Sequence, residues 1–394
     1  MTLAEYVANR AETWFSDGRP VAVATITLIR GSSSQPLGSR LVATDGGEFA
    51  GFVSGGCVET DVYEQAQQVL ADGVPRKLHY RQVKDSLFEI GLNCDGQIDV
   101  VLERLDERAL QALRPAAGSV ELLRYRDSDT DGAGASPDAL AIEHLRVADT
   151  EGAARGGGTG SKGEDRPEYA TSLPPEVLHA ISESQNSGRA TSAVGSDGWN
   201  YLIEPGAAPA TLLIVSASSV AFPLCKLGKA LGYRVVVSDP RSTYLSEDRF
   251  PEADLLLSIW PKDLPEHIVF GPDVHVVSLN HEPRFEDDLF RTLQSQPRVG
   301  YIGAIGKRKR HTERIARQAD SGFDLDKLPT IHTPVGLDLG GKSAEEVALS
   351  IMAQIQAIRN GSPGGSLSNQ VQSAALQAGS EQSKAATVPS GDLK

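Results

Sequence analysis

Alternating strand and helix patterns in the C-terminal half of the sequence most constrain the fold. Short apolar runs typical of buried strands recur at 211–215, 233–238, 255–258, 274–279 and 299–302. Helical patterns lie between or after several of these runs. Because strands joined by helices pair in parallel, this half predicts a doubly wound parallel sheet.

The last helix of this half has clear end signals. Ser343 and Glu346 form a capping box, apolar residues then repeat on one face, and Asn360 with Gly361 ends the pattern. The tail 361–394 contains no aromatic residue, so we expect it to be disordered.

The N-terminal residues predict a smaller α+β domain built around a hairpin. The hairpin signal is the sequence Asp45-Gly46-Gly47 between two short apolar runs. The expected elements are a helix from Thr2 to about Asp17, a strand at 21–29, hairpin strands at 40–44 and 48–53, a helix ending near Asp72, and strands at 76–80 and 97–102.

Small residues gather at both outer ends of this hairpin. They are Gly31, Ser32, Ser33, Ser34 and Gly38 upstream, and Ser54, Gly55, Gly56 and Cys57 downstream. Since the outer ends of a hairpin lie side by side, the two loops should converge into one floor whose backbone N–H groups are accessible to a ligand. This floor is the leading candidate for a binding site.

We expect the 394 residues to divide into several regions. These are an N-terminal domain at 1–105, a variable connection at 106–205 with a disordered insertion at about 127–171, a C-terminal domain at 206–360, and the tail 361–394. Within the connection, a helix at 174–183 and a hairpin across 196–198 lead into the C-terminal domain.

Composition excludes several classes of protein. A net charge of −14 argues against general affinity for nucleic acid or anionic membranes. The three cysteines, Cys57, Cys94 and Cys225, are too few and too scattered for a disulfide framework or a CxxC metal site. With no signal peptide and no run long enough to span a bilayer, a cytoplasmic protein is expected.

The turn after the first strand of the C-terminal half has the frame of a dinucleotide fingerprint without its leading glycines. Ser216 and Ser218 stand where G-x-G-x-x-G/A requires glycine, and Asp239 follows at the distance of a ribose-binding acid. Because a serine Cβ obstructs close approach of a pyrophosphate, NAD(P) binding is not expected, and a Rossmann-like scaffold is the simpler interpretation.

A second glycine turn opens a basic segment. Gly303 to Gly306 is followed by Lys307, Arg308, Lys309, Arg310 and His311, which favours a phosphate at a helix N-terminus. A solvated, charged helix face would give the same pattern. His281, at the end of a strand, is either a ligand-orienting residue or an ordinary hydrogen-bonded histidine.

The pattern G-S-S-x-x-P-x-G-x-R-L followed by D-G-x-x-x-x-G-x-V-S-G-G-C-V-E resembles the N-terminal signature of XdhC/CoxI proteins. The segments around Gly303, His281 and His332 with Asp338 resemble later motifs of the same family, and the loop 91–96 resembles another, with Asp95 in place of a glycine. The resemblance extends over about 1–105 and 206–360. It implies that Arg40 and Glu59 belong to the cofactor site with the loop residues above.

Membership of that family implies an accessory role, not an enzyme. Such proteins bind molybdenum cofactor, as molybdopterin or its dinucleotide, and deliver it to xanthine, aldehyde or carbon monoxide dehydrogenases. The resemblance also implies an apo-hydroxylase partner, contact with a cysteine desulfurase, and a homodimer. In this hypothesis the phosphate of the pterin meets the Gly306 turn and its ring meets the two hairpin loops.

Among the residues of the two hairpin loops, Cys57 carries a nucleophilic side chain. It precedes a helix, whose N-terminal N–H groups favour a thiolate that could transfer sulfur or contact molybdenum. A small buried hydrophobe is the alternative interpretation of a free cysteine.

Two other functions remain open from the sequence. One is a nicotinamide-dependent oxidoreductase on the same scaffold, against which the missing glycines argue. The other is a non-catalytic interaction protein that has lost ligand binding.

Overall fold

The computed structural model describes residues 1–82, 91–92, 95–127, 140–148, 173–206, 208–280, 282–306, 324 and 327–368. The chain forms two compact units, Met1–Ala208 and Pro209–Lys394. The region 106–205, which we expected to be a connection, is therefore part of the first unit.

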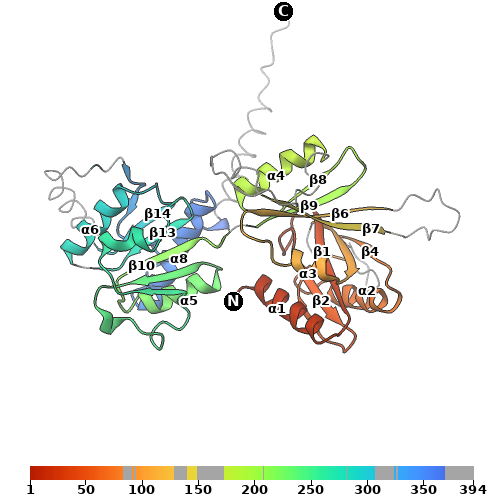
Figure 1. Ribbon diagram of the computed structural model, residues 1–394, viewed down its shortest axis with the longest axis horizontal. Coiled ribbons are helices and arrows are strands. Elements are labelled where there is room, and N and C mark those ends of the chain that lie inside the picture. The colour runs from red at the N-terminus through yellow and green to blue at the C-terminus, as the bar shows by residue number, and fades with distance from the viewer. Residues whose placement is uncertain are drawn as a thin grey trace, which may run out of the picture. The chain divides into compact units, whose positions relative to one another are not determined.

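The first unit begins with the predicted α+β elements. They are α1 (Leu3–Ser16), β1 (Val21–Arg30), β2 (Arg40–Thr44), β3 (Phe49–Gly51), α2 (Glu59–Asp72), β4 (Arg76–Arg81) and β5 (Gln97–Arg104). A short helix that was not predicted, α3 (Glu107–Ala112), follows. The strands form an antiparallel sheet in the order β3-β2-β1-β5-β4. Figure 1 labels β1, β2 and β4 of this sheet.

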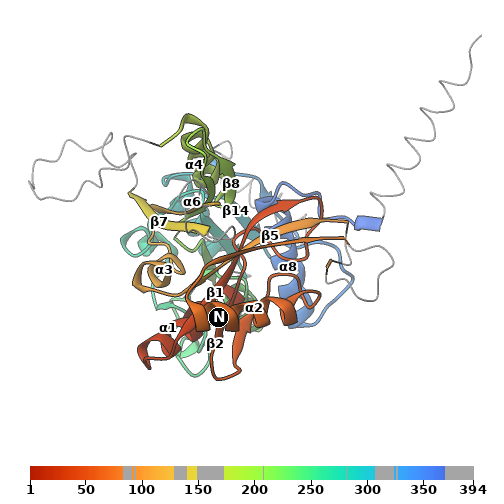
Figure 2. The same ribbon diagram turned by 90° about the vertical axis from the view of Figure 1, so that its right-hand side faces the viewer.

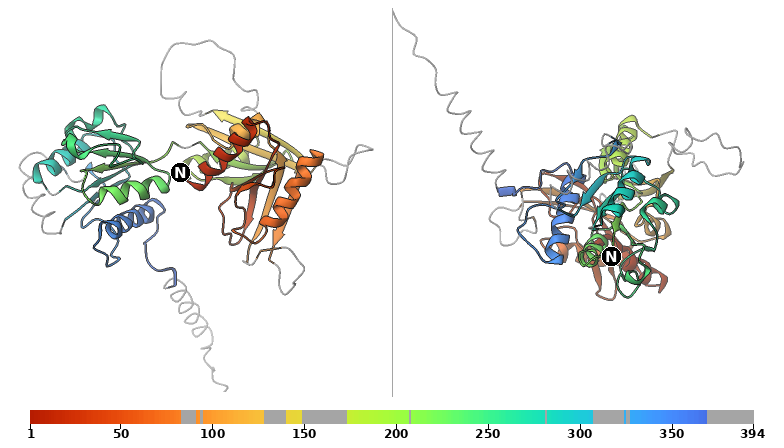
Figure 3. Two further views of the ribbon diagram at one scale, coloured as in Figure 1. Left: turned by 90° about the horizontal axis from the view of Figure 1, so that it is seen from below. Right: turned by 90° about the vertical axis from the view of Figure 1, so that its left-hand side faces the viewer.

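Opposite faces of this sheet pack against different helices. Ala22, Ala24 and Ile26 of β1 join a core with α2, whereas Val21 and Val23 join a core with α1 and α3. This division follows from the two-residue period of a strand. Figure 2 and the left view in Figure 3 show α1 and α2 on either side of β1 and β2.

The predicted hairpin is present as β2 and β3. Leu41 pairs with Gly51 and Val42 with Ala50, and the N–H of Thr44 donates to the carbonyl of Glu48 across the turn. The hairpin therefore brings the chain back to the end of β1, where the glycine-rich loops lie.

A second antiparallel sheet lies within the first unit, in the order β7-β6-β9-β8. It consists of β6 (Ser119–Asp127), β7 (Leu140–Ala148), β8 (Thr191–Val194) and β9 (Asn200–Pro205), and α4 (Pro175–Ser187) packs on it. Its other face meets Val101 of β5. The helix and the hairpin predicted at 174–183 and 196–198 are confirmed.

The expected disorder across 127–171 is wrong in part, because β7 lies inside that segment. This strand pairs with β6 along its whole length, from Ser119 opposite Ala148 to Asp127 opposite Leu140. Its charged residues pair with carboxylates or guanidinium groups on other strands, such as His144 with Glu103. The stretches 128–139 and 149–172 lie outside the described residues.

The second unit confirms the doubly wound parallel sheet. Its elements are β10 (Thr211–Val215), α5 (Ala221–Ala230), β11 (Arg234–Ser238), η2 (Ser242–Tyr244), β12 (Leu255–Leu257), η3 (Pro261–Glu266), β13 (Val274–Ser278), α6 (Pro283–Gln294), β14 (Tyr301–Ala304), β15 (Ile331–His332) and α8 (Ala344–Arg359). The strand order β12-β11-β10-β13-β14-β15 is that of a Rossmann sheet, and every pairing is parallel.

Helices cover both faces of this sheet. Leu212 and Ile214 of β10 pack with α5 and α8, whereas Leu213 and Val215 pack with α6 and η3. In Figure 3, left, α5 and α8 lie side by side beneath the strands. The capping box at Ser343 and the end of α8 at Asn360 are as predicted. Among the described helices, none has the length and apolarity to cross a membrane.

Candidate functional site

The two glycine- and serine-rich loops of the hairpin meet, as the sequence predicts. The hydroxyl of Ser34 donates to the carbonyl oxygen of Ser54, and a Cβ added to Gly55 would lie 3.2 Å from the Ser34 hydroxyl oxygen. The floor is therefore formed by loops that flank β2 and β3.

A third loop packs against the same place. A Cβ on Gly96 would lie 1.7 Å from the carbonyl oxygen of Ser32, and one on Gly31 would lie 2.8 Å from that of Asp95. Only glycine permits the first of these approaches without a shift of backbone. Asn93 and Cys94, from the same loop, lie outside the described residues.

The backbone N–H groups of the downstream loop of this floor are already occupied. The carboxylate of Glu59, at the first turn of α2, folds back under the loop and accepts from the N–H groups of Val53, Ser54, Gly55 and Gly56 at 2.8 to 3.1 Å. It also accepts from the Ser54 hydroxyl at 2.5 Å. For residues 53–56 the expectation that these N–H groups are accessible to a ligand is wrong, because the chain supplies its own anion.

These hydrogen bonds also set the charge of Glu59. Burial, with 8% of the residue exposed, acts to raise its pKa. The hydrogen bonds from the Ser54 hydroxyl and from the N–H groups of Ser54 and Gly56 outweigh burial and lower the pKa below its ordinary value. Glu59 is therefore a carboxylate at neutral pH.

The loop that Glu59 holds presents Cys57 to solvent. Gly55 and Gly56 have φ values of 76° and 118°, a region that favours glycine, and the N–H groups of Cys57 and Val58 donate to the Ser54 hydroxyl oxygen. Cys57 is exposed. The alternative interpretation of a buried hydrophobe is thus excluded for Cys57.

Cys225 shows the opposite environment. It is fully buried in α5, and burial raises its thiol pKa to about 12. It is therefore a packing residue and not a candidate for chemistry.

Arg40 has a partner within the first unit. Its guanidinium forms a two-pronged ion pair with Glu204, and a Cβ on Gly38 would meet the same carboxylate at 2.7 Å. The charge of Arg40 is therefore compensated by a residue that no sequence motif marks. Ser33 is also engaged locally, since its hydroxyl donates to the carbonyl of Gln35 at 2.7 Å.

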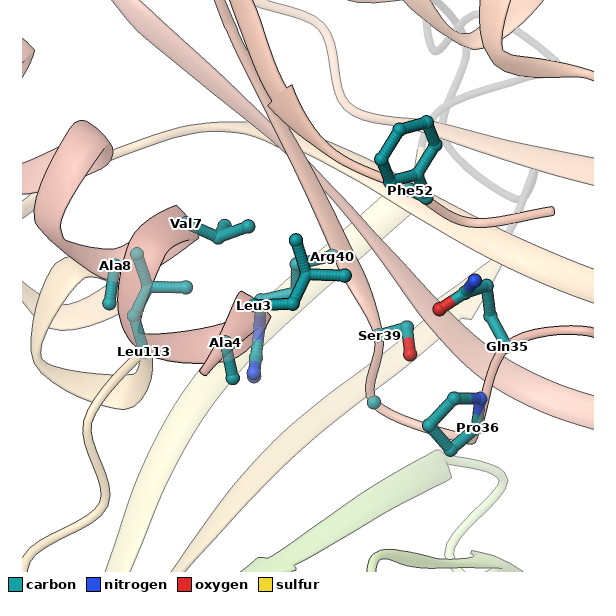
Figure 4. A pocket seen from close by; sticks show the side chains of 11 residues that line it. Leu3, Ala4, Val7, Ala8, Gln35, Pro36, Ser39, Arg40, Phe52 and Leu113 are labelled. Atoms are coloured by element: carbon teal, nitrogen blue, oxygen red, sulfur yellow. The ribbon is translucent and has the colours of Figure 1, made fainter. Parts of the chain in front are cut away.

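A pocket of about 180 Å³ adjoins the upstream loop (Figure 4). Its wall is mostly apolar, with Leu3 and Val7 from α1 and Phe52 from beyond β3. Gln35 and Pro36 of the loop complete one side. Gly38 and Arg40 also line the pocket, so it includes the upstream end of the floor but not the Glu59 loop.

In the serine-substituted turn of the second unit, the backbone at Ser216 still adopts a positive φ, and the carboxylate of Asp239 is hydrogen-bonded within the chain. Ser216 has φ 87° and is the only residue other than glycine with positive φ among the described residues. Asp239 is 1% exposed, and its carboxylate accepts from Arg241 through Nε, Nη2 and the backbone N–H and from the Ala217 N–H at 2.8 to 3.0 Å. These bonds occupy the carboxylate of Asp239 from within the chain.

Of the remaining candidates, Gly303 and His332 lie in β14 and β15, and Gly306 follows β14. Gly303 is buried against Val335, and Gly306 has φ 130°. His332 stacks on Tyr301 with ring centroids 5.1 Å apart, and burial lowers its pKa. Asp338 is exposed. Lys307, Arg308 and His281 lie outside the described residues, as do 309–311.

Among the described residues, no group of three His, Cys, Asp or Glu side chains could hold a metal ion. Within the part of the chain that the structure describes, Cys57 therefore belongs to no such group.

Comparison with known proteins gives two family matches. Residues 14–81 match the XdhC and CoxI family, and residues 212–355 match the XdhC Rossmann domain. The first match includes the floor and Glu59, and the second spans the parallel sheet from β10 into α8.

Relatives align along most of the chain. A Bacillus subtilis (strain 168) protein, named as a probable xanthine dehydrogenase subunit, is 25% identical over 352 residues, covering 86% of this chain and 93% of that protein. "Molybdenum cofactor insertion chaperone PaoD" from Escherichia coli (strain K12) is 22% identical over 344 residues, covering 87% of this chain and 84% of that one.

A solved structure shares the fold. The crystal structure of a xanthine dehydrogenase from Bacillus halodurans matches with a TM-score of 0.66 at 24% identity, covering 93% of this chain and 98% of that one. Both family matches, in their order along the chain, and the near full-length relatives lead to one conclusion. This chain belongs to the XdhC and CoxI family.

Proposed function

We propose that this protein binds molybdenum cofactor, protects it, and inserts it in sulfurated form into a molybdenum hydroxylase of the xanthine, aldehyde or carbon monoxide dehydrogenase type. Family membership supports this role, as does the name of the Escherichia coli relative. On this proposal the chain is an accessory chaperone, and the redox chemistry belongs to the hydroxylase that receives the cofactor.

The observation that carries the proposal is the exposed thiol of Cys57 on a glycine loop fixed from beneath. Thiolate sulfur is a soft ligand, suited to a metal that already has sulfur ligands. We assign Cys57 to contact with the molybdenum or its terminal sulfur. Ser32, Ser33 and the outer surface of loop 54–57 would contact the pterin ring.

The phosphate of the cofactor needs a different element. Because Glu59 already accepts from the N–H groups of residues 53–56, an anionic group of the ligand does not fit against that loop. We keep the Gly303–Gly306 turn with Lys307 and Arg308 as the proposed phosphate-binding element, since a glycine turn followed by basic residues suits a phosphate.

We also propose that the chain does not use NAD(P). The closed carboxylate of Asp239 supports this, as do the serines at 216 and 218. Whether the cargo is molybdopterin or its dinucleotide follows from the hydroxylase served. An apo-hydroxylase, a cysteine desulfurase and a second copy of the chain are the proposed partners, in the cytoplasm.

Cofactor retention tests the proposal. Wild-type protein and the Cys57→Ala variant would be incubated with molybdenum cofactor, desalted, and analysed for molybdenum and pterin, with NADPH fluorescence titration in parallel. We expect wild type to retain both, Cys57→Ala to retain clearly less, and neither to respond to NADPH.

The matched control is Cys225→Ala, which removes a thiol far from the floor in sequence and should leave retention near wild type. If wild-type protein retains no pterin, the cofactor-binding role is wrong. If Cys57→Ala retains as much as wild type, the thiol has no part in it. A saturable NADPH response would instead favour the oxidoreductase.

A further inference from the structure

The carboxylate of Glu59 has a role that neither its family signature nor its charge indicates. We propose that Glu59 is a positioning residue, a built-in anion that holds loop 54–57 in place, and that it does not contact the cofactor. Cys57 is the group that this loop presents.

The acceptor capacity of Glu59 is fully used. One carboxylate oxygen accepts from the N–H groups of Val53, Ser54 and Gly55, and the other accepts from the Ser54 hydroxyl and the Gly56 N–H. A carboxylate offers about four lone-pair positions. Five donors leave no position for a hydroxyl or amide of a ligand.

The donors are equally unavailable. Consecutive N–H groups that converge in this way form a nest of the kind that binds phosphates and other anions. Here the first residue of α2 fills the nest from inside, with the residue 8% exposed. A free anion could enter only if the Glu59 side chain were absent.

Ser54 links Glu59 to the backbone of Cys57 through its hydroxyl group. Its hydroxyl donates its proton to Glu59 at 2.5 Å, so the oxygen is left to accept from the N–H groups of Cys57 at 2.9 Å and Val58 at 3.0 Å. Removal of the carboxylate should therefore loosen the backbone of Cys57 as well as that of the two glycines.

Replacement of the anion gives a direct test. In the full-length Glu59→Ala variant, we expect the N–H groups of residues 53–56 to lose most of their protection in amide hydrogen exchange. Formate is small enough to enter the vacated nest and carries the same charge, so it should restore protection in a saturable way. Equal ionic strength of sodium chloride, or the neutral analogue acetamide, should not.

The control is Glu64→Ala on the exposed face of α2, which should keep wild-type protection with or without formate. If Glu59→Ala proves poorly folded, Ser54→Ala serves instead, and it should reduce protection at residues 57 and 58 without any response to formate. Unchanged protection in Glu59→Ala, or rescue by acetamide as strong as by formate, would overturn the proposal.

The inference rests on the proposed function only in naming Cys57 as the group presented. Hydrogen exchange requires no molybdenum cofactor, so it tests Glu59 even if wild type fails to retain pterin. If wild type does retain it, Glu59→Ala should retain clearly less, and formate should restore part of the loss. A retention loss that formate leaves unchanged would indicate direct contact with the cofactor and contradict the positioning role.

Discussion

At the scale of single residues, the floor depends on one acidic side chain. Glu59 lies two positions after Cys57 and neutralises the partial positive charges of four backbone N–H groups. The same interaction explains why two consecutive glycines precede the cysteine, since the chain must turn through φ values that other residues rarely adopt.

The lowered pKa of Glu59 predicts a pH-dependent contribution to stability. Because the folded pKa lies below the ordinary value of 4.5, the contribution is complete above about pH 4.5 and is lost as pH falls through the folded pKa. Glu59→Gln should therefore lower the free energy of unfolding at pH 7 by about 1 to 3 kcal/mol, since the amide NH₂ cannot accept and leaves a buried backbone N–H group unpaired.

Thermal unfolding from pH 7 to pH 3 checks this prediction. The difference in melting temperature between wild type and Glu59→Gln should become smaller as the pH falls. Glu64→Gln should follow the wild-type curve throughout. A gap between wild type and Glu59→Gln that stays constant with pH would show that ionised Glu59 does not stabilise the fold.

The sequence predicted where the small-residue loops lie but not what fills them. Glycine and serine mark the turns because of their own backbone and hydroxyl properties. The direction of the Glu59 side chain, in contrast, depends on the loop already having folded over α2. The Arg40–Glu204 pair was missed for a related reason, because its residues lie 164 positions apart.

At the scale of elements, the periodic patterns succeeded where one face is apolar. The helices α1, α2 and α8 and the strands β10 to β14 of the parallel sheet were predicted from such patterns, whereas the two-residue strand β15 was not. β7 was missed because charged residues interrupt its apolar ones. Its Arg146 pairs with Glu121 and its Glu143 with Arg124, both on β6, and these partners are invisible in a local window.

Packing of β7 can be tested by truncation of a buried side chain. Leu140 is 8% exposed and packs with Val101, Leu123, Tyr125 and Leu202. Leu140→Ala should destabilise the first unit by about 2 kcal/mol, at the low end for buried leucines because the residue lies at a strand end.

Urea unfolding followed by circular dichroism measures this cost. Leu367→Ala is the matched control, since Leu367 is 77% exposed and its truncation should change stability by less than about 0.5 kcal/mol. Equal stability of the two variants would mean that β7 does not pack as described.

At the scale of the whole molecule, two compact units have different chemistry. The first carries the exposed thiol and the floor, and the second carries a Rossmann sheet in which the carboxylate of Asp239 accepts hydrogen bonds from Arg241. Fold class was predictable for both units because it depends on strand and helix order. The hydrogen bonds from Arg241 to Asp239 were not predictable, because a sequence fingerprint specifies the spacing of residues and not their hydrogen-bond partners.

Transfer of the cofactor tests the central claim most directly. Full-length protein loaded with sulfurated molybdenum cofactor would be mixed with an apo-hydroxylase of the xanthine dehydrogenase type, and substrate oxidation would be followed against an equal amount of free cofactor. We predict faster and more complete activation from the loaded wild-type protein, and activation by Cys57→Ala no better than by free cofactor. Equal activation by wild type, Cys57→Ala and free cofactor would contradict the account.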